Sequence, residues 1–160
     1  MILIGIDPGL SGALAFLPDG GATAIFDMPV HLLVRGGRRK REIDTAGLVA
    51  LVADHGPIDH AFVEQIGAMP GQGVSSVFAL GKGYGMILGV LAALAVPITL
   101  VAPAKWKRAL GVPAAKDGAR ARASQLMPAA ARQWPLVKHD GRAEAALLAF
   151  YGLRTLHGDC

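Results

Sequence analysis

The chain has 160 residues, enough for one domain that buries about two thirds of the surface its unfolded form would expose. Its single cysteine, Cys160 at the last position, excludes an internal disulfide and a thiolate metal cluster. Lysine and arginine number 16 against 12 acids, and the net charge of +4 favours a polyanionic partner. We expect a single domain over residues 1–160.

Hydrophobic residues make up 52% of the chain, yet the longest apolar stretch, 86–98, is shorter than the roughly 20 residues that a membrane span requires. We predict that this stretch is a buried helix running toward a strand. The N-terminus lacks a basic segment and its apolar start is interrupted at Asp7, so no signal peptide is expected. These features predict a cytoplasmic protein with no membrane partner.

The first part of the chain is predicted to form strands at 2–7, 13–17 and 22–28. The first run is apolar, rich in β-branched residues and too short for a helix. The Pro-Asp-Gly-Gly sequence at 18–21 predicts a hairpin between the second and third strands. Residues 34–41 follow as a polar loop with two glycines.

The second part alternates between helices and strands. A long helix at 74–95 carries one charge, Lys82, and its glycines at 81, 85 and 89 share one face, which predicts close packing against a sheet or a partner. The other predicted elements are a helix at 45–55 capped by Asp44, strands at 60–64 and 97–101, and helices at 103–110, 117–127 and 141–156. Three antiparallel strands followed by α-β-α-β-α predict an α/β fold with a mixed five-stranded sheet and helices on both faces.

Two acids end predicted strands. Asp7 ends the first strand and Glu64 the fourth, so the two carboxylates meet at one edge if these strands are neighbours. A charge at the edge of a core requires a partner or a metal, and Mg²⁺ prefers carboxylate oxygens. The alternative is that Asp7 caps the turn at Pro8-Gly9 and that Glu64 is solvated.

The last helix brings further acids. Asp140 and Glu144 are four residues apart and share a helix face, and Glu144 heads an apolar stripe. Alternatively, Asp140 is an N-cap and Glu144 interacts with the helix dipole, although a capping box needs a spacing of three. His139 is a ligand, a proton shuttle or an exposed turn residue. Acids from three segments predict a divalent-metal site.

Three motifs resemble those of RuvC-type Holliday-junction resolvases, within the ribonuclease H-like nuclease superfamily: GIDPGLSG at 5–12, VEQ at 63–65 with FALG at 78–81, and DGRAEAA at 140–146. The match spans nearly the whole chain. Cellular members carry a final pair of acids, or His and Asp, spaced by three, whereas Asp140 and Glu144 are spaced by four. This form is more similar to phage or prophage relatives, and either Asp140 or His139 would partner Glu144.

The resemblance implies a homodimeric endonuclease that uses Mg²⁺ or Mn²⁺, two ions per site, to cut four-way DNA junctions by paired nicks. Such an enzyme acts in DNA recombination and repair. The implied metal ligands are Asp7, Glu64, Asp140 and Glu144, with Asp7 bridging both ions. Lys107 and Lys116 resemble basic positions near the scissile phosphate in the family. His139 and Lys107 are added to the four acids as candidate catalytic residues.

Basic residues predict a nucleic-acid interface. A run at 35–41 is predicted to be a phosphate-binding arm, with reach from its two glycines, and the alternative is an ordinary solvated loop. Phe78 is either a wedge in the junction, as the resemblance implies, or a core residue, and Trp106 is predicted to be core. The predicted DNA-binding residues are Arg35, Arg38, Arg39, Lys40, Arg41, Phe78, Lys82, Lys105, Lys107 and Lys116.

Other classes of protein share some of these sequence features. A sugar kinase or actin-like ATPase shares the strand order and the Asp-x-Gly opening but needs two such domains. A non-catalytic DNA-binding module does not explain the acids. A ribonuclease H-like nuclease acting on RNA–DNA hybrid or other branched DNA shares them and stays open. The glycine-striped helix favours a dimer and hence a two-fold substrate.

Overall fold

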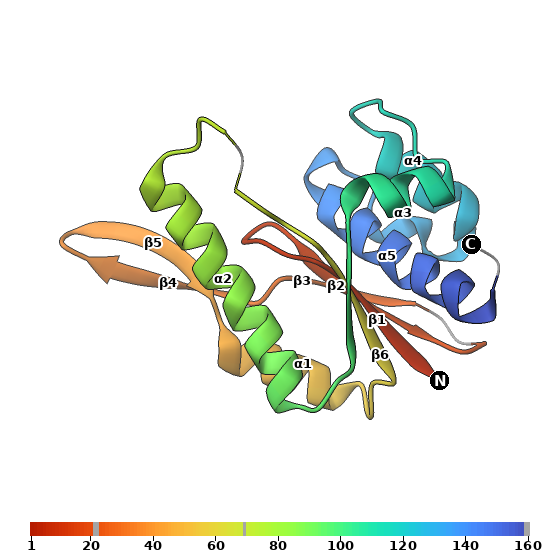
Figure 1. Ribbon diagram of the computed structural model, residues 1–160, viewed down its shortest axis with the longest axis horizontal. Helices are drawn as coiled ribbons and strands as arrows, with labels where there is room; N and C mark the ends of the chain where they lie inside the picture. Colours follow the sequence, from red (N-terminus) through yellow and green to blue (C-terminus); the bar gives the residue numbers. More distant parts are fainter. Residues whose placement is uncertain (21–22, 69, 159–160) are drawn as a thin grey trace.

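The computed structural model describes residues 1–20, 23–68 and 70–158 (Figure 1). Positions 21 and 22, in the predicted hairpin turn and at the predicted start of the third strand, lie outside the described residues. A five-stranded sheet has the order β3-β2-β1-β6-β7. Its strands are β1 (Ile2–Asp7), β2 (Ala13–Pro18), β3 (Ala24–Asp27), β6 (His60–Glu64) and β7 (Ile98–Val101). β1, β2 and β3 pair antiparallel, while β6 and β7 run parallel to β1, so the predicted mixed sheet is confirmed.

Helices cover both faces of the sheet (Figure 1). Alternation along β1 decides which residues each face receives, because successive side chains point to opposite sides. Ile4 and Ile6 belong to the core under α1 and α2, and Leu3 belongs to the core under α3, α4 and α5. These helices are α1 (Thr45–Asp54), α2 (Val74–Ala93), α3 (Pro103–Leu110), α4 (Gly118–Leu126) and α5 (Asp140–His157). Two short 3₁₀ helices, Pro128–Gln133 and Val137–His139, which were not predicted, join α4 to α5.

Glycines set how closely α5 lies on the sheet. A Cβ on Gly5 of β1 would collide with the carbonyl oxygen of Ala145 and the amide nitrogen of Ala149 in α5. A Cβ on Gly152 of α5 would likewise meet the ring of Phe62 in β6. Neither close approach leaves room for a side chain. The contact fixes the first turns of α5 beside the end of β1.

The basic run is not a loop, and that prediction was wrong. β4 (Val30–Arg35) and β5 (Arg38–Ile43) pair as an antiparallel hairpin, seen beside α2 in Figure 1. Gly36 and Gly37 form its two-residue turn with φ of 57° and 73°, values that glycine adopts easily. Burial patterning could not reveal these strands, because Leu32 and Val34 are exposed and β5 is rich in charge.

The stretch 86–98 contains the end of α2 and runs toward β7, as predicted, but only one face of the helix is buried. In α2 only Ile87, Val90 and Leu91 are buried. The glycine face does not pack on the sheet, because a Cβ at position 81, 85 or 89 would meet no atom within 4 Å. α2 is long and apolar enough to cross a membrane, with a mean hydropathy of 1.5 over 18 residues, but its second half packs on the sheet. Packing of the glycine face against a partner stays a prediction.

Candidate metal centre and nucleic-acid interface

Asp7 and Glu64 end parallel neighbouring strands. Ile6 of β1 is paired with Val63 of β6, so the acids that follow them leave the sheet at the same edge. The carboxyl ends of parallel strands are the usual place for a ligand site in an open α/β sheet. α5 closes this edge at Gly141, where a Cβ would lie 2.8 Å from Oδ2 of Asp7. One turn further along α5, Glu144 reaches the same place.

The charges of these three acids act on one another. Burial, followed by the charges of Glu144 and Glu64, raises the pKa of Asp7 from its ordinary 3.8 to about 8, against the opposing effect of Lys107. Burial also raises the pKa of Glu64, although a hydrogen bond from Trp106 opposes it. Asp7, Glu64 and Glu144 therefore form one electrostatic unit, which we call the acid cluster.

α3 supplies a partner to two members of the acid cluster. Buried Trp106 donates a hydrogen bond from Nε1 to Oε2 of Glu64 over 2.8 Å. The next residue, Lys107, places Nζ 2.8 Å from Oε1 of Glu144 and 5.0 Å from the centre of the Trp106 ring. Burial acts to lower the pKa of Lys107, but the hydrogen bond and charge of Glu144 outweigh it and raise that pKa. Trp106 is core, as predicted, but its role toward Glu64 carries no signal in the sequence.

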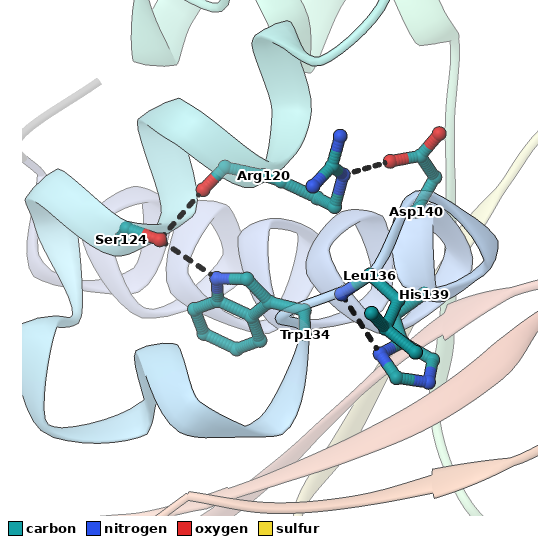
Figure 2. A network of polar contacts seen from close by, with 6 residues as sticks. All are labelled: Arg120, Ser124, Trp134, Leu136, His139 and Asp140. Carbon is teal, nitrogen blue, oxygen red and sulfur yellow. Dashed lines mark hydrogen bonds and ion pairs between the residues drawn. The ribbon is translucent and has the colours of Figure 1, made fainter.

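Asp140 and His139 lie apart from the acid cluster. Figure 2 shows Asp140 turned toward Arg120 of α4, whose Nε lies 2.6 Å from Oδ1. Arg120 is held in turn, because its carbonyl accepts a hydrogen bond from Ser124, whose Oγ accepts one from Trp134. His139 is turned to its own backbone, with Nδ1 accepting from the amide of Leu136 at 3.3 Å.

The position three residues before Glu144, where cellular relatives of the resembled family carry a ligand, is Gly141. It is packed against Asp7 and the carbonyl oxygen of Ser11, with no room for a side chain. No described contact brings Asp140 or His139 to Asp7, Glu64 or Glu144. The chain therefore assembles three of the four predicted metal ligands in one place.

The acid cluster fits a divalent cation in donor type and charge. All its donors are carboxylate oxygens, which hard cations prefer, and a bound cation would reverse the raised pKa values of Asp7 and Glu64. Among the described residues, no group of three Asp, Glu, His or Cys side chains is arranged closely enough to hold an ion without rearrangement. Lys107 supplies positive charge to the acid cluster there, with its ammonium group on Oε1 of Glu144.

A groove of about 1510 Å³ opens beside the acid cluster. Asp7, the loop at 8–12 and Ile66 line it together with residues of β5 and α2. Phe78 stands on its α2 side with 74% of its surface exposed, so the core role is excluded. Four predicted DNA-binding cations line the groove: Arg38, Lys40, Arg41 and Lys82.

The other predicted DNA-binding cations differ in position. Arg39, Lys105 and Lys116 are exposed and do not line the groove. The side chain of Arg35 lies outside the described part of the structure. Lys107 faces the acid cluster itself.

Known structures share the fold of this chain. No protein-family model matches the chain, and no curated protein sequence matches it. The structure is similar to that of Thermus thermophilus RuvC in complex with a Holliday junction substrate, with a TM-score of 0.60 and 14% identity over 99% of this chain and 98% of that one. The chain has the RuvC fold. A second Thermus thermophilus RuvC structure agrees, with a TM-score of 0.59 and 18% identity over the same shares of the two chains. The predicted ribonuclease H-like fold class is thereby confirmed.

Proposed function

We propose that this chain is a single-domain, divalent-metal-dependent endonuclease that resolves four-way DNA junctions. The observation that carries the proposal is the convergence of Asp7, Glu64 and Glu144 beside Lys107, at the carboxyl edge of a sheet with the RuvC fold. A groove with four cations in its lining includes Asp7 as well. A solved protein with this fold binds a Holliday junction, which supports the choice of substrate.

The residues of the site have distinct roles in this proposal. Asp7, Glu64 and Glu144 would hold Mg²⁺ or Mn²⁺, with two ions expected from the family resemblance. Such ions lower the pKa of the attacking water and neutralise charge on the phosphate. Trp106 keeps the carboxylate of Glu64 oriented. Lys107, which is paired with Glu144 in the free protein, would contact a phosphate oxygen of the bound DNA.

The fourth predicted ligand, Asp140, is paired with Arg120. Asp140 remains in the proposed ligand set only if Arg120 releases it, because their ion pair of 2.6 Å holds the carboxylate on α4. His139 has no described contact with the acid cluster, and we leave it out of the proposed chemistry.

A homodimer is part of the proposal. A four-way junction presents two equivalent strands, so two sites related by one axis would make paired symmetric nicks. The glycine face of α2 offers a surface for it, because a Cβ at Gly81, Gly85 or Gly89 would meet no atom within 4 Å.

The test is cleavage of a mobile four-way junction, a linear duplex and an RNA–DNA hybrid, each with Mg²⁺ and with chelator. We expect Mg²⁺-dependent cutting of the junction alone. Asp7→Asn should reduce cutting by more than the roughly 10–100-fold typical of losing an outer partner of a metal ligand. Junction binding should survive or tighten, since a negative charge near the phosphates is lost.

Asp19→Asn, which removes an exposed acid in the turn after β2, is the matched control and should cut normally. Cutting of the hybrid in place of the junction would favour the ribonuclease H-like alternative. Substantial cutting by Asp7→Asn would remove the proposed metal site.

A further inference from the structure

The groove beside the acid cluster has two chemically different walls. On the hairpin side, β5 contributes the cations Arg38 and Lys40. On the α2 side the lining includes the exposed apolar side chains of Val74 and Phe78 beside two serines, and the cation of this side, Lys82, is paired with Glu42 of β5. The cationic wall and the apolar wall face the same space, and Asp7 lines it as well.

Two polar links attach the hairpin wall to its surroundings. Arg41 donates from Nη2 to the carbonyl oxygen of Leu10, in the loop that follows Asp7, over 2.5 Å. Lys82 of α2 lies 2.9 Å from Oε2 of Glu42 in β5. The first link ties the hairpin to the loop of the acid cluster, and the second joins the two walls. The groove is thus continuous with the candidate metal centre.

The difference between the two walls favours one kind of nucleic acid, a single strand, over a duplex. An unpaired strand has phosphates along one side and bases on the other, and single-strand binding sites pair a cationic track with aromatic side chains for the bases. A duplex has its bases inside and phosphates on both outer edges, so one row of phosphates would face Val74 and Phe78.

We propose that this groove binds an unpaired DNA strand, with its phosphates on β5 and its bases on α2, and leads it to the acid cluster. The inference rests on the proposed nuclease function and extends it from fully paired junctions to branched DNA that carries a free single strand.

Binding is measured with chelator present, so that no cleavage occurs, using fluorescence anisotropy of a labelled oligo(dT) of about 12 nucleotides, within the ~4–16 that typical single-strand sites cover. The matched variants are Arg38→Ser and Arg39→Ser. They remove the same side chain from adjacent positions of β5, and only Arg38 lines the groove. A third variant, Lys40→Ser, repeats the test at the second cation of the wall.

We expect Arg38→Ser and Lys40→Ser each to reduce the slope of log affinity against log salt by about 0.7, the value for one lost phosphate contact on a single strand. Arg39 does not line the groove, so Arg39→Ser should reduce the slope by less than Arg38→Ser does. Phe78→Ala should weaken binding by at least about fivefold through the loss of one stacked base. All four side chains are exposed, so the fold should persist, and thermal unfolding of each variant checks this.

Two results would overturn the inference: a blunt duplex of equal length that binds as tightly as oligo(dT) at the same salt, or equal effects of Arg38→Ser and Arg39→Ser. A different result would contradict the proposed nuclease function without contradicting single-strand binding. In that case the protein would not cut any junction with Mg²⁺, while oligo(dT) binding and its dependence on Arg38 would remain.

Discussion

Individual contacts distinguish the three acids of the cluster. Glu64 receives a hydrogen bond from Trp106, which opposes the effect of burial on its pKa, and Glu144 forms an ion pair with Lys107. Burial at Asp7 raises its pKa, and the charges of the other two acids add to this effect. The pKa of Asp7, about 8, therefore lies near the neutral range.

The indole of Trp106 should matter for metal binding. Trp106→Phe keeps an aromatic ring in the core but removes the N–H that orients Glu64. We expect the affinity for Mn²⁺, measured by calorimetry, to fall about 10–100-fold, as is typical when an outer partner of a ligand is lost. Trp134→Phe removes an N–H bonded to Ser124, which belongs to the Arg120 network, and serves as control. Equal affinities in the two variants would contradict this role.

Stability should decrease with rising pH in the absence of divalent metal. The pKa of Asp7 is about 8 in the folded chain against an ordinary value of 3.8, so the folded state binds more protons between these values. Asp7 makes its full contribution to the free energy of unfolding below about pH 4. As the pH rises toward 8, that contribution decreases by up to about 1.4 kcal/mol per pH unit. Burial of Glu64 acts in the same direction.

Urea unfolding with chelator between pH 5 and pH 8 measures this slope. Asp7→Asn cannot titrate at that position, so we expect a flatter profile and a variant more stable than the original protein at pH 8. Profiles of equal slope would show that Asp7 is not protonated in the folded chain.

At the scale of the elements, the packing of α5 on β1 positions the acids. Gly5→Ala would place a methyl group against backbone atoms of Ala145 and Ala149, which a side-chain rotation cannot relieve. We expect a loss of about 1–3 kcal/mol in the free energy of unfolding, the usual effect of overpacking. Cleavage should fall as well, since Glu144 moves with α5.

Gly67→Ala is the control for this variant, because a Cβ at Gly67 meets no atom within 4 Å. Chemical unfolding and junction cleavage are measured on both proteins. A Gly5→Ala protein as stable and active as Gly67→Ala would show that the close contact of α5 with the sheet is not needed.

At the scale of the whole molecule, the open glycine face of α2 offers a test of the dimer. Gly85→Leu should break a dimer formed through α2, and its side chain meets open space in a single chain, so the fold should be kept. Sedimentation at micromolar concentration should show a dimer for the original protein and a monomer for the variant, with paired cutting lost. Gly67→Leu, at another open position, should stay dimeric. A monomer that still makes paired symmetric cuts would refute the dimer.

Much of the fold follows from local patterns in the sequence. Apolar runs of strand length, the Asp44 cap of α1 and the glycine and proline stops predict the elements of the central sheet and most helix bounds. The placement of Asp7 and Glu64 at the ends of strands follows too. These features depend on the geometry of the chain over a few residues, which the sequence alone determines. The meeting of the two acids at one edge depends in addition on β1 and β6 being neighbours, which the sheet order decides.

Tertiary structure decided what depends on neighbours distant in the chain. Asp140 and Glu144 share a helix face, yet Arg120 binds one and Lys107 the other, because α4 and α3 pack on different parts of α5. The hairpin escaped prediction because Leu32 and Val34 are exposed, so no burial pattern marks its strands. Charge pairing and burial are set by distances between elements, and those distances are fixed by packing such as that of Gly5 against α5.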